Sequence, residues 1–82
     1  MKQGFHMNKQ EAISKLRRMV EKAWCSYTFD QAYSLWKKVA TSYPLPYELA
    51  RPVSVELYHA ENEGTQGKLA LKDAVDRLIG GL

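Results

Sequence analysis

Cysteine and histidine are scarce in this 82-residue chain, which contains one cysteine and two histidines. A single cysteine, Cys25, permits no intrachain disulfide and excludes a zinc site that needs several cysteines. Cys25 follows Trp24 within an apolar helical pattern. A catalytic nucleophile needs a nearby histidine and a positive setting, so we expect Cys25 to be a small buried thiol.

Long apolar runs are also missing. Nothing behind Met1 has the continuous apolar character of a signal peptide or a membrane span. We therefore expect a cytoplasmic protein without a membrane partner. Met7 opens the segment MNKQEAI, which is typical of a natural start. Residues 1–7 are predicted to be a flexible leader, with Met1–His6 an upstream extension, and residues 8–82 a single domain.

Known catalytic signatures are absent from the sequence: it has no Gly-rich phosphate loop after a strand and no Gly-x-Ser-x-Gly elbow. Glu56 and His59 have the Glu-x-x-His spacing of di-metal carboxylate bundles, and Glu63 follows one turn later. Such a site needs a second copy of the motif and two more glutamates. We interpret His59 as a surface histidine in an acidic helix end. We expect no enzyme, no metal, no cofactor and no small-molecule substrate.

The composition is that of a folded domain, with 45% hydrophobic and 26% charged residues. Period-two alternation, the pattern of a strand, occurs only at Val53–Leu57, and one strand cannot make a sheet. The sequence therefore predicts an all-α fold. A domain of this size is marginally stable, and association with a copy of itself or with another chain is a common remedy.

Two capping boxes predict the first two helices. Asn8 and Glu11 form one, and Thr28 and Gln31 form the other. Apolar residues recur at offsets of three and four after each box. We predict a first helix that ends near Tyr27 and a second over residues 29–42. Because the connection is so short, the two should form an antiparallel hairpin.

All three prolines lie in the segment YPLPYELARP, residues 43–52. Pro44 cannot continue the second helix, whereas Pro46 suits the first turn of a new one. Inside a continuous helix, Pro52 would clash with the carbonyl of Glu48. We predict a separate turn over residues 47–51 and a third helix that begins at Pro52, the alternative being one helix kinked at Pro52.

The polar segment 61–67 should end the third helix, with Thr65 capping a fourth and Gly80 closing it in the left-handed conformation. The expected fold is a small four-helix, bundle-like domain: an N-terminal antiparallel hairpin, a Pro-rich crossover and two shorter helices. The largely buried residues are predicted to be Leu16, Val20, Trp24, Trp36, Val39, Leu57, Val75 and Leu78.

Aromatic residues are concentrated in the middle of the chain, where eight of the nine lie between positions 24 and 58. Their helical spacing favours a core. A small bundle cannot enclose so many rings, however, and tyrosine and tryptophan are enriched at protein interfaces. We therefore predict an exposed apolar patch in the stiff proline segment, with four candidate partner-binding residues: Tyr43, Pro44, Pro46 and Tyr47.

Basic residues suggest an alternative site. Lys15, Arg18 and Lys22 lie opposite the apolar stripe of the first helix, and Lys37 and Lys38 follow on the second. A basic helix face is typical of phosphate contact with nucleic acid, although a solvated face with interspersed acids has the same pattern. The aromatic second helix does not suit a helix-turn-helix reader, so contact would be to phosphates rather than base edges.

Three functional hypotheses follow. The favoured one is a small intracellular accessory or regulatory protein that acts by protein–protein interaction, including as a homodimer. The alternative is a nucleic-acid-binding regulator that uses the basic face of the first helix. The third is a structural protein that only self-associates. The five basic residues separate the first two, since phosphate binding requires them to form one continuous patch.

Overall fold

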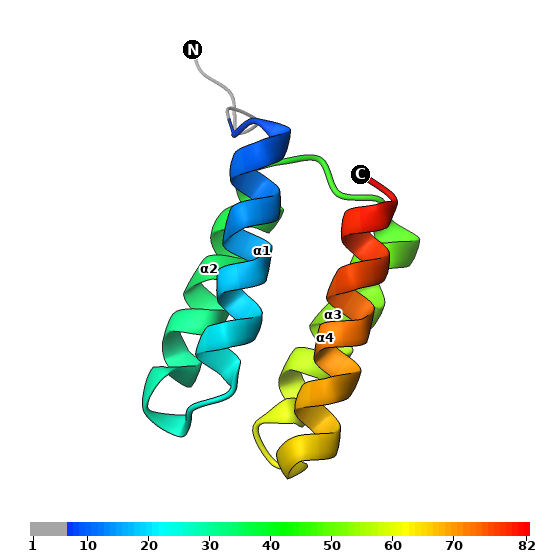
Figure 1. Ribbon diagram of the computed structural model, residues 1–82. Helices are drawn as coiled ribbons and strands as arrows, with labels where there is room; N and C mark the ends of the chain where they lie inside the picture. Colours follow the sequence, from blue (N-terminus) through cyan, green and yellow to red (C-terminus); the bar gives the residue numbers. More distant parts are fainter. Residues whose placement is uncertain (1–6) are drawn as a thin grey trace.

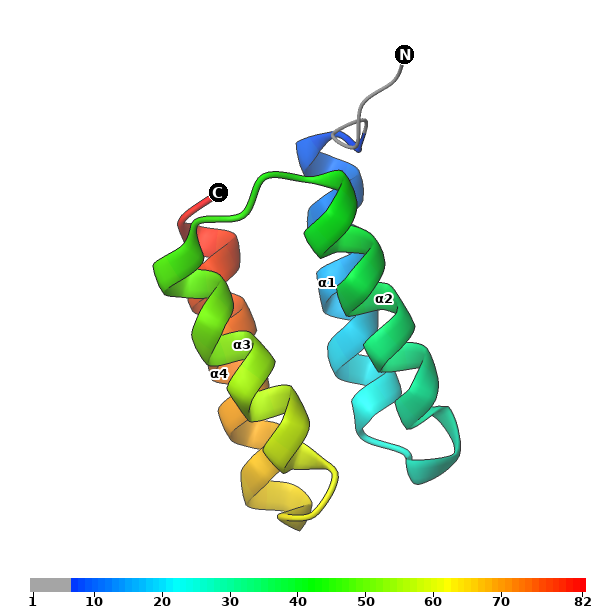
Figure 2. The same cartoon turned by 180° about the vertical axis from the view of Figure 1, so that it is seen from behind.

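The computed structural model describes residues 7–82, which form two helical hairpins side by side (Figures 1 and 2). The first hairpin contains α1 (Lys9–Ala23) and α2 (Phe29–Ser42), joined by the short 3-10 turn η1 (Ser26–Thr28). The second contains α3 (Tyr47–Ala60) and α4 (Gly64–Gly80). The described residues contain no strand, and the all-α prediction is confirmed.

The start of α1 is the predicted one, because the Asn8 side chain accepts a hydrogen bond from the Glu11 amide at 2.8 Å. Its end is not. The helix stops at Ala23 rather than near Tyr27, and Cys25 has extended backbone angles. The Thr28 hydroxyl donates to the Lys22 carbonyl at 2.6 Å and to the Cys25 carbonyl at 3.2 Å. Thr28 therefore satisfies carbonyls at the end of α1, and its predicted capping of α2 is wrong.

This early end of α1 changes the surroundings of Trp24 and Cys25. Both residues lie beyond the helix, where the period of the apolar stripe no longer holds. Trp24 is 44% exposed, and Cys25 is exposed as well. The predicted burial of both side chains is therefore wrong. The antiparallel arrangement of α1 and α2 is confirmed (Figure 1).

The third helix begins at Tyr47, so its predicted start at Pro52 is wrong. The Pro46 carbonyl accepts hydrogen bonds from the amides of Leu49 and Ala50 at 3.1 and 2.9 Å, which fixes the first turn. Pro52 lies inside the helix on its exposed side. Pro52 has no amide to donate to the Glu48 carbonyl, so α3 lacks that hydrogen bond, and the exposed position of the proline keeps its ring out of the core.

The fourth helix differs from its prediction at both ends. Thr65 does not cap it, because α4 begins at Gly64, whose φ of +63° only glycine adopts without strain. Gly80 remains helical and Gly81, also right-handed, follows it, so the predicted left-handed Gly80 is wrong. Gly67 is buried where α4 leaves the turn, and an added Cβ there would lie 3.1 Å from the Ala60 Cα. Glycine therefore permits the close approach of α3 and α4.

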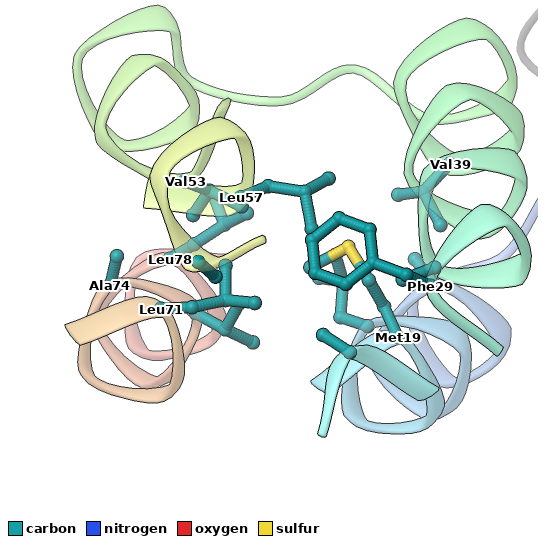
Figure 3. Packing of buried hydrophobic residues seen from close by; sticks show 14 of the residues in the cluster. Met19, Phe29, Val39, Val53, Leu57, Leu71, Ala74 and Leu78 are labelled. Atoms are coloured by element: carbon teal, nitrogen blue, oxygen red, sulfur yellow. The ribbon is translucent and has the colours of Figure 1, made fainter. Parts of the chain in front are cut away.

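The hydrophobic core joins the two hairpins. Figure 3 shows Leu57 and Leu71 of the second hairpin extending toward Phe29 and Met19 of the first. The helices through which the hairpins meet most closely are α1 and α4. Five of the predicted core residues are buried and two, Val20 and Trp36, are half-buried; the five are Leu16, Val39, Leu57, Val75 and Leu78.

Met7 also belongs to the core, although the sequence assigns it to the leader. Its side chain is 8% exposed, and its amide donates to the Ser42 carbonyl at 3.1 Å. This bond connects the residue before α1 to the last residue of α2, so the open end of the first hairpin is closed. The predicted extension, Met1–His6, lies outside the described residues.

Candidate binding surfaces

The structure brings together all five basic residues of the nucleic-acid alternative. They line one open surface groove of about 1120 Å³, here called the basic groove, which runs between α1 and α2. Helix α1 contributes Lys15, Arg18 and Lys22, and α2 contributes Lys37 and Lys38. The five predicted residues therefore share one groove, whose lining also contains two acidic residues, Glu21 and Asp30.

Helix geometry explains this grouping. Offsets of three and four residues put Lys15, Arg18 and Lys22 on one flank of α1, beside the buried stripe rather than opposite it as predicted, and Lys15 and Lys22 are half-buried. In an antiparallel hairpin the adjoining flank of α2 lies alongside, and it carries Lys37 and Lys38. The half-buried Leu35 also lines the groove, and the remaining uncharged lining residues are polar: Gln31, Ser34, Thr41 and Ser42.

The cationic groups of the basic groove have no carboxylate partner within residues 7–82. The ion pairs found there all lie after α2: Lys72 Nζ–Asp76 Oδ2 at 3.0 Å, Arg77–Asp73 at 3.4 Å and His59 Nδ1–Glu63 Oε2 at 4.0 Å. Two acids, Glu21 and Asp30, line the groove without forming an ion pair. Its lysines and arginine are therefore available to an external anion.

Charge is distributed unequally between the hairpins. Residues 8–43 contain seven lysines and arginines against three acidic residues, whereas residues 47–82 contain four against six. The first hairpin thus carries the whole positive excess of the described part, and the second is acidic. The modest net charge of the chain, +3, conceals this separation.

A second surface lies on the outer face of α3. Tyr47, Arg51, Val55 and Tyr58 occupy successive turns and form what we call the α3 stripe. Tyr47 is 75% exposed, Tyr58 66% and Val55 43%. The Tyr47 end of the stripe contains a shallow hollow of about 400 Å³. Tyr47, Arg51 and Val55 line this hollow together with Glu48.

The four predicted partner-binding residues have different surroundings. Tyr43 is half-buried and packs against the core, whereas Pro44, Pro46 and Tyr47 are exposed. Arg51, Val55 and Tyr58 are neighbours of Tyr47 that the predicted start of the third helix at Pro52 does not reveal, because Tyr47 and Arg51 then lie outside the helix. Offsets of four, four and three from Tyr47 are the signal that would have found them.

Tyr33 is a titratable group that lies between the hairpins. It is half-buried on α2, and its ring meets that of Phe29 edge-to-face with centroids 5.5 Å apart. Burial raises the pKa of the Tyr33 hydroxyl, and the negative charge of Glu61 and the proximity of Tyr58 raise it further. The phenol of Tyr33 therefore loses its proton at a higher pH than that of an ordinary tyrosine.

Within residues 7–82, no group of three or more histidine, cysteine, aspartate or glutamate side chains is arranged to hold a metal ion. The same residues include no helix with both the length and the apolar character that crossing a membrane requires. Comparisons of the chain with protein-family models, with curated proteins and with solved structures find no match.

Proposed function

We propose that this protein is a small cytoplasmic accessory or regulatory protein that acts by binding another protein chain or a second copy of itself through the α3 stripe. One observation carries the proposal: three large apolar side chains, Tyr47, Val55 and Tyr58, are exposed along one face of α3, with Arg51 on the turn between the first two. Pro44 and Pro46, exposed just before the stripe, would extend the contact.

Most aromatic residues in the middle of the chain are not enclosed by the core. Of the eight, only Phe29 is buried, and four are exposed: Trp24, Tyr27, Tyr47 and Tyr58. Covering a large apolar side chain is worth about 1.5–3 kcal/mol relative to leaving it in water. A partner that covers the α3 stripe would gain only a part of this energy at each side chain, because Tyr47, Tyr58 and Val55 are 75%, 66% and 43% exposed.

The composition and rigidity of the α3 stripe favour a protein partner. Tyrosine and arginine are among the residues that contribute most to binding energy at protein interfaces. Glu48 and Glu56 flank the apolar side chains, as polar residues do at the edge of an interface. Because the residues stand on a helix, little backbone order has to be gained on binding.

The test removes both rings of the stripe, with the variant Tyr47→Ser/Tyr58→Ser. Self-association is measured by sedimentation velocity, and partners are captured from cells with and without nuclease. We expect the variant to lose association by about tenfold or more, since each ring is an interface anchor, with little change in melting temperature. Tyr27→Ser is the matched control, because Tyr27 is 94% exposed but lies in the η1 turn.

Two results would contradict the proposal. In one, the double variant lowers the melting temperature sharply and leaves association unchanged, which would assign the rings to the fold. In the other, Tyr27→Ser weakens association as much as the double variant does. Association would then depend on exposed tyrosines in general, wherever they lie, and not on the α3 stripe.

A further inference from the structure

We propose that the basic groove binds the sugar–phosphate backbone of nucleic acid without reading the base sequence. This inference goes beyond the proposed function, because it concerns the first hairpin and does not require the α3 stripe. It rests on five cationic side chains that line one groove from two helices and have no carboxylate partner among the described residues.

The spacing of the cations along α1 suits a phosphate chain. With a rise of about 1.5 Å per residue, Lys15, Arg18 and Lys22 span roughly 10 Å of the helix axis. A single strand of duplex DNA presents a phosphate every 3.4 Å or so along its axis, so this span matches about three phosphates. Lys37 and Lys38 face the same groove from α2 and add to the positive field.

The charge of the groove is graded along its length. Helices α1 and α2 are antiparallel (Figure 1). Glu21 and Asp30 lie within the turns of α1 and α2 nearest to η1, and Lys15 and Lys38 lie farther along these helices. The end near the turn is therefore partly neutralised. We infer that phosphate contacts concentrate at the other end, and that the two acids oppose binding.

The lining also explains why we choose backbone contact over base reading. Thr41, a polar residue of the groove, already donates its hydroxyl to the Lys37 carbonyl at 2.9 Å and to the Lys38 carbonyl at 3.3 Å. Lysine and arginine bind phosphate oxygens whatever the sequence. Binding should therefore depend on charge and salt.

An anionic membrane suits the basic groove less well. Helices that lie on a membrane insert large apolar side chains beside their basic residues. The groove offers only the half-buried Leu35, and no aromatic residue lines it. A polar groove of this kind suits a polyanion such as single-stranded or duplex nucleic acid better than it suits a lipid surface.

The experiment measures the fluorescence anisotropy of a labelled single-stranded DNA and of a labelled duplex of equal length. Binding is compared at about 50 and 200 mM salt, because an affinity that depends on phosphate contacts falls as salt concentration rises. The groove variant is Arg18→Gln/Lys38→Gln. The matched control is Arg17→Gln/Lys68→Gln, which removes the same charge from residues outside the groove. A second variant, Glu21→Gln/Asp30→Asn, removes the opposing acids.

We expect wild-type protein to bind both DNA probes at low salt. The groove variant should lose about tenfold or more in affinity. The slope of its log affinity against log salt concentration should fall by the contribution of about two phosphate contacts. The control should change affinity much less, and Glu21→Gln/Asp30→Asn should bind more tightly. Circular dichroism checks that each variant is folded.

The inference is overturned if wild-type protein binds neither probe at low salt, or if the groove variant and the control lose affinity equally. It is also overturned if Glu21→Gln/Asp30→Asn leaves affinity unchanged. Preference for phosphatidylserine vesicles or for polyglutamate over both DNA probes would assign the groove to a membrane or to an acidic protein instead.

Discussion

The burial of individual side chains shows that an apolar pattern of helical period predicts burial only as far as the helix itself continues. Leu16 and Trp24 lie on one predicted stripe, two turns apart, yet Leu16 is fully buried and Trp24 is 44% exposed. The pattern of apolar residues continues beyond Ala23, but the helix does not. A side chain after the last helical residue no longer points in the direction that the helical period predicts.

The burial of Leu16 gives a prediction for the stability of the fold. Replacing it with alanine leaves a cavity at the centre of the first hairpin, and we expect the free energy of unfolding to fall by about 2–5 kcal/mol. Urea denaturation measures the change. A loss smaller than that caused by Trp24→Ala would show that the core is not centred on Leu16.

Tyr33 predicts how stability depends on alkaline pH. Its pKa is raised in the folded protein, first by burial, so the folded state keeps the phenol proton at pH values where the unfolded chain loses it. The Tyr33 contribution is therefore fully present below the ordinary tyrosine pKa of about 10 and is lost as pH rises through the folded value.

The variant Tyr33→Phe cannot titrate at this position. Compared with wild type in urea denaturation series between roughly pH 8 and 11, it should lose less stability as pH rises past the ordinary tyrosine pKa. Parallel curves for the two proteins would show that the Tyr33 hydroxyl titrates alike in the folded and unfolded states.

At the scale of helices, ends were harder to predict than centres. The spacing of Thr28 and Gln31 fits a capping box, but the Thr28 hydroxyl has a nearer use, because the carbonyls of Lys22 and Cys25 lie within reach once α1 turns back. The same local sequence is thus compatible with Thr28 capping α2 and with Thr28 bonding the carbonyls at the end of α1. Only the path of the chain between the helices decides which is formed.

Pro52 is the second such case, and it yields a prediction. Proline inside a helix removes one backbone hydrogen bond and crowds the preceding turn, at a cost of about 3 kcal/mol relative to alanine. Proline also restricts the unfolded chain, which offsets roughly 1 kcal/mol of this. Pro52→Ala should therefore raise the free energy of unfolding by about 1–2 kcal/mol, as measured by urea denaturation.

The control for this prediction is Pro44→Ala, since Pro44 lies in the extended segment between α2 and α3. That substitution gains no helical hydrogen bond and only frees the unfolded chain, so it should be neutral or slightly destabilising. If Pro52→Ala behaves like Pro44→Ala, then α3 is interrupted at Pro52 in solution.

For the whole molecule, the sequence was sufficient to predict the all-α class, the antiparallel first hairpin and the burial of five of the eight residues expected in the core. Apolar spacing alone determines these features. The α3 stripe was not predictable in full, because it depends on where α3 begins. The five basic residues of the groove were predicted from the sequence. That they line one groove could be seen only once α1 and α2 were placed side by side.

The two proposed surfaces belong to different hairpins. The basic groove lies between α1 and α2, and the α3 stripe lies on the outer side of α3. Substitutions at sites without shared contacts have nearly additive effects, so each surface can be altered without disturbing the other. The salt dependence of DNA binding and the loss of self-association can thus be measured as separate properties.

The pairing of neighbouring helices also bears on how the chain folds. Helix α1 packs along α2 and α3 along α4, and each pair is joined by a short connection. Most native contacts therefore form between segments that are close in sequence, which is the topology of rapid folding. Each hairpin can act as a cooperative unit of local opening. We infer from this topology that the docking of the two hairpins, which brings Leu57 toward Phe29, comes late in folding.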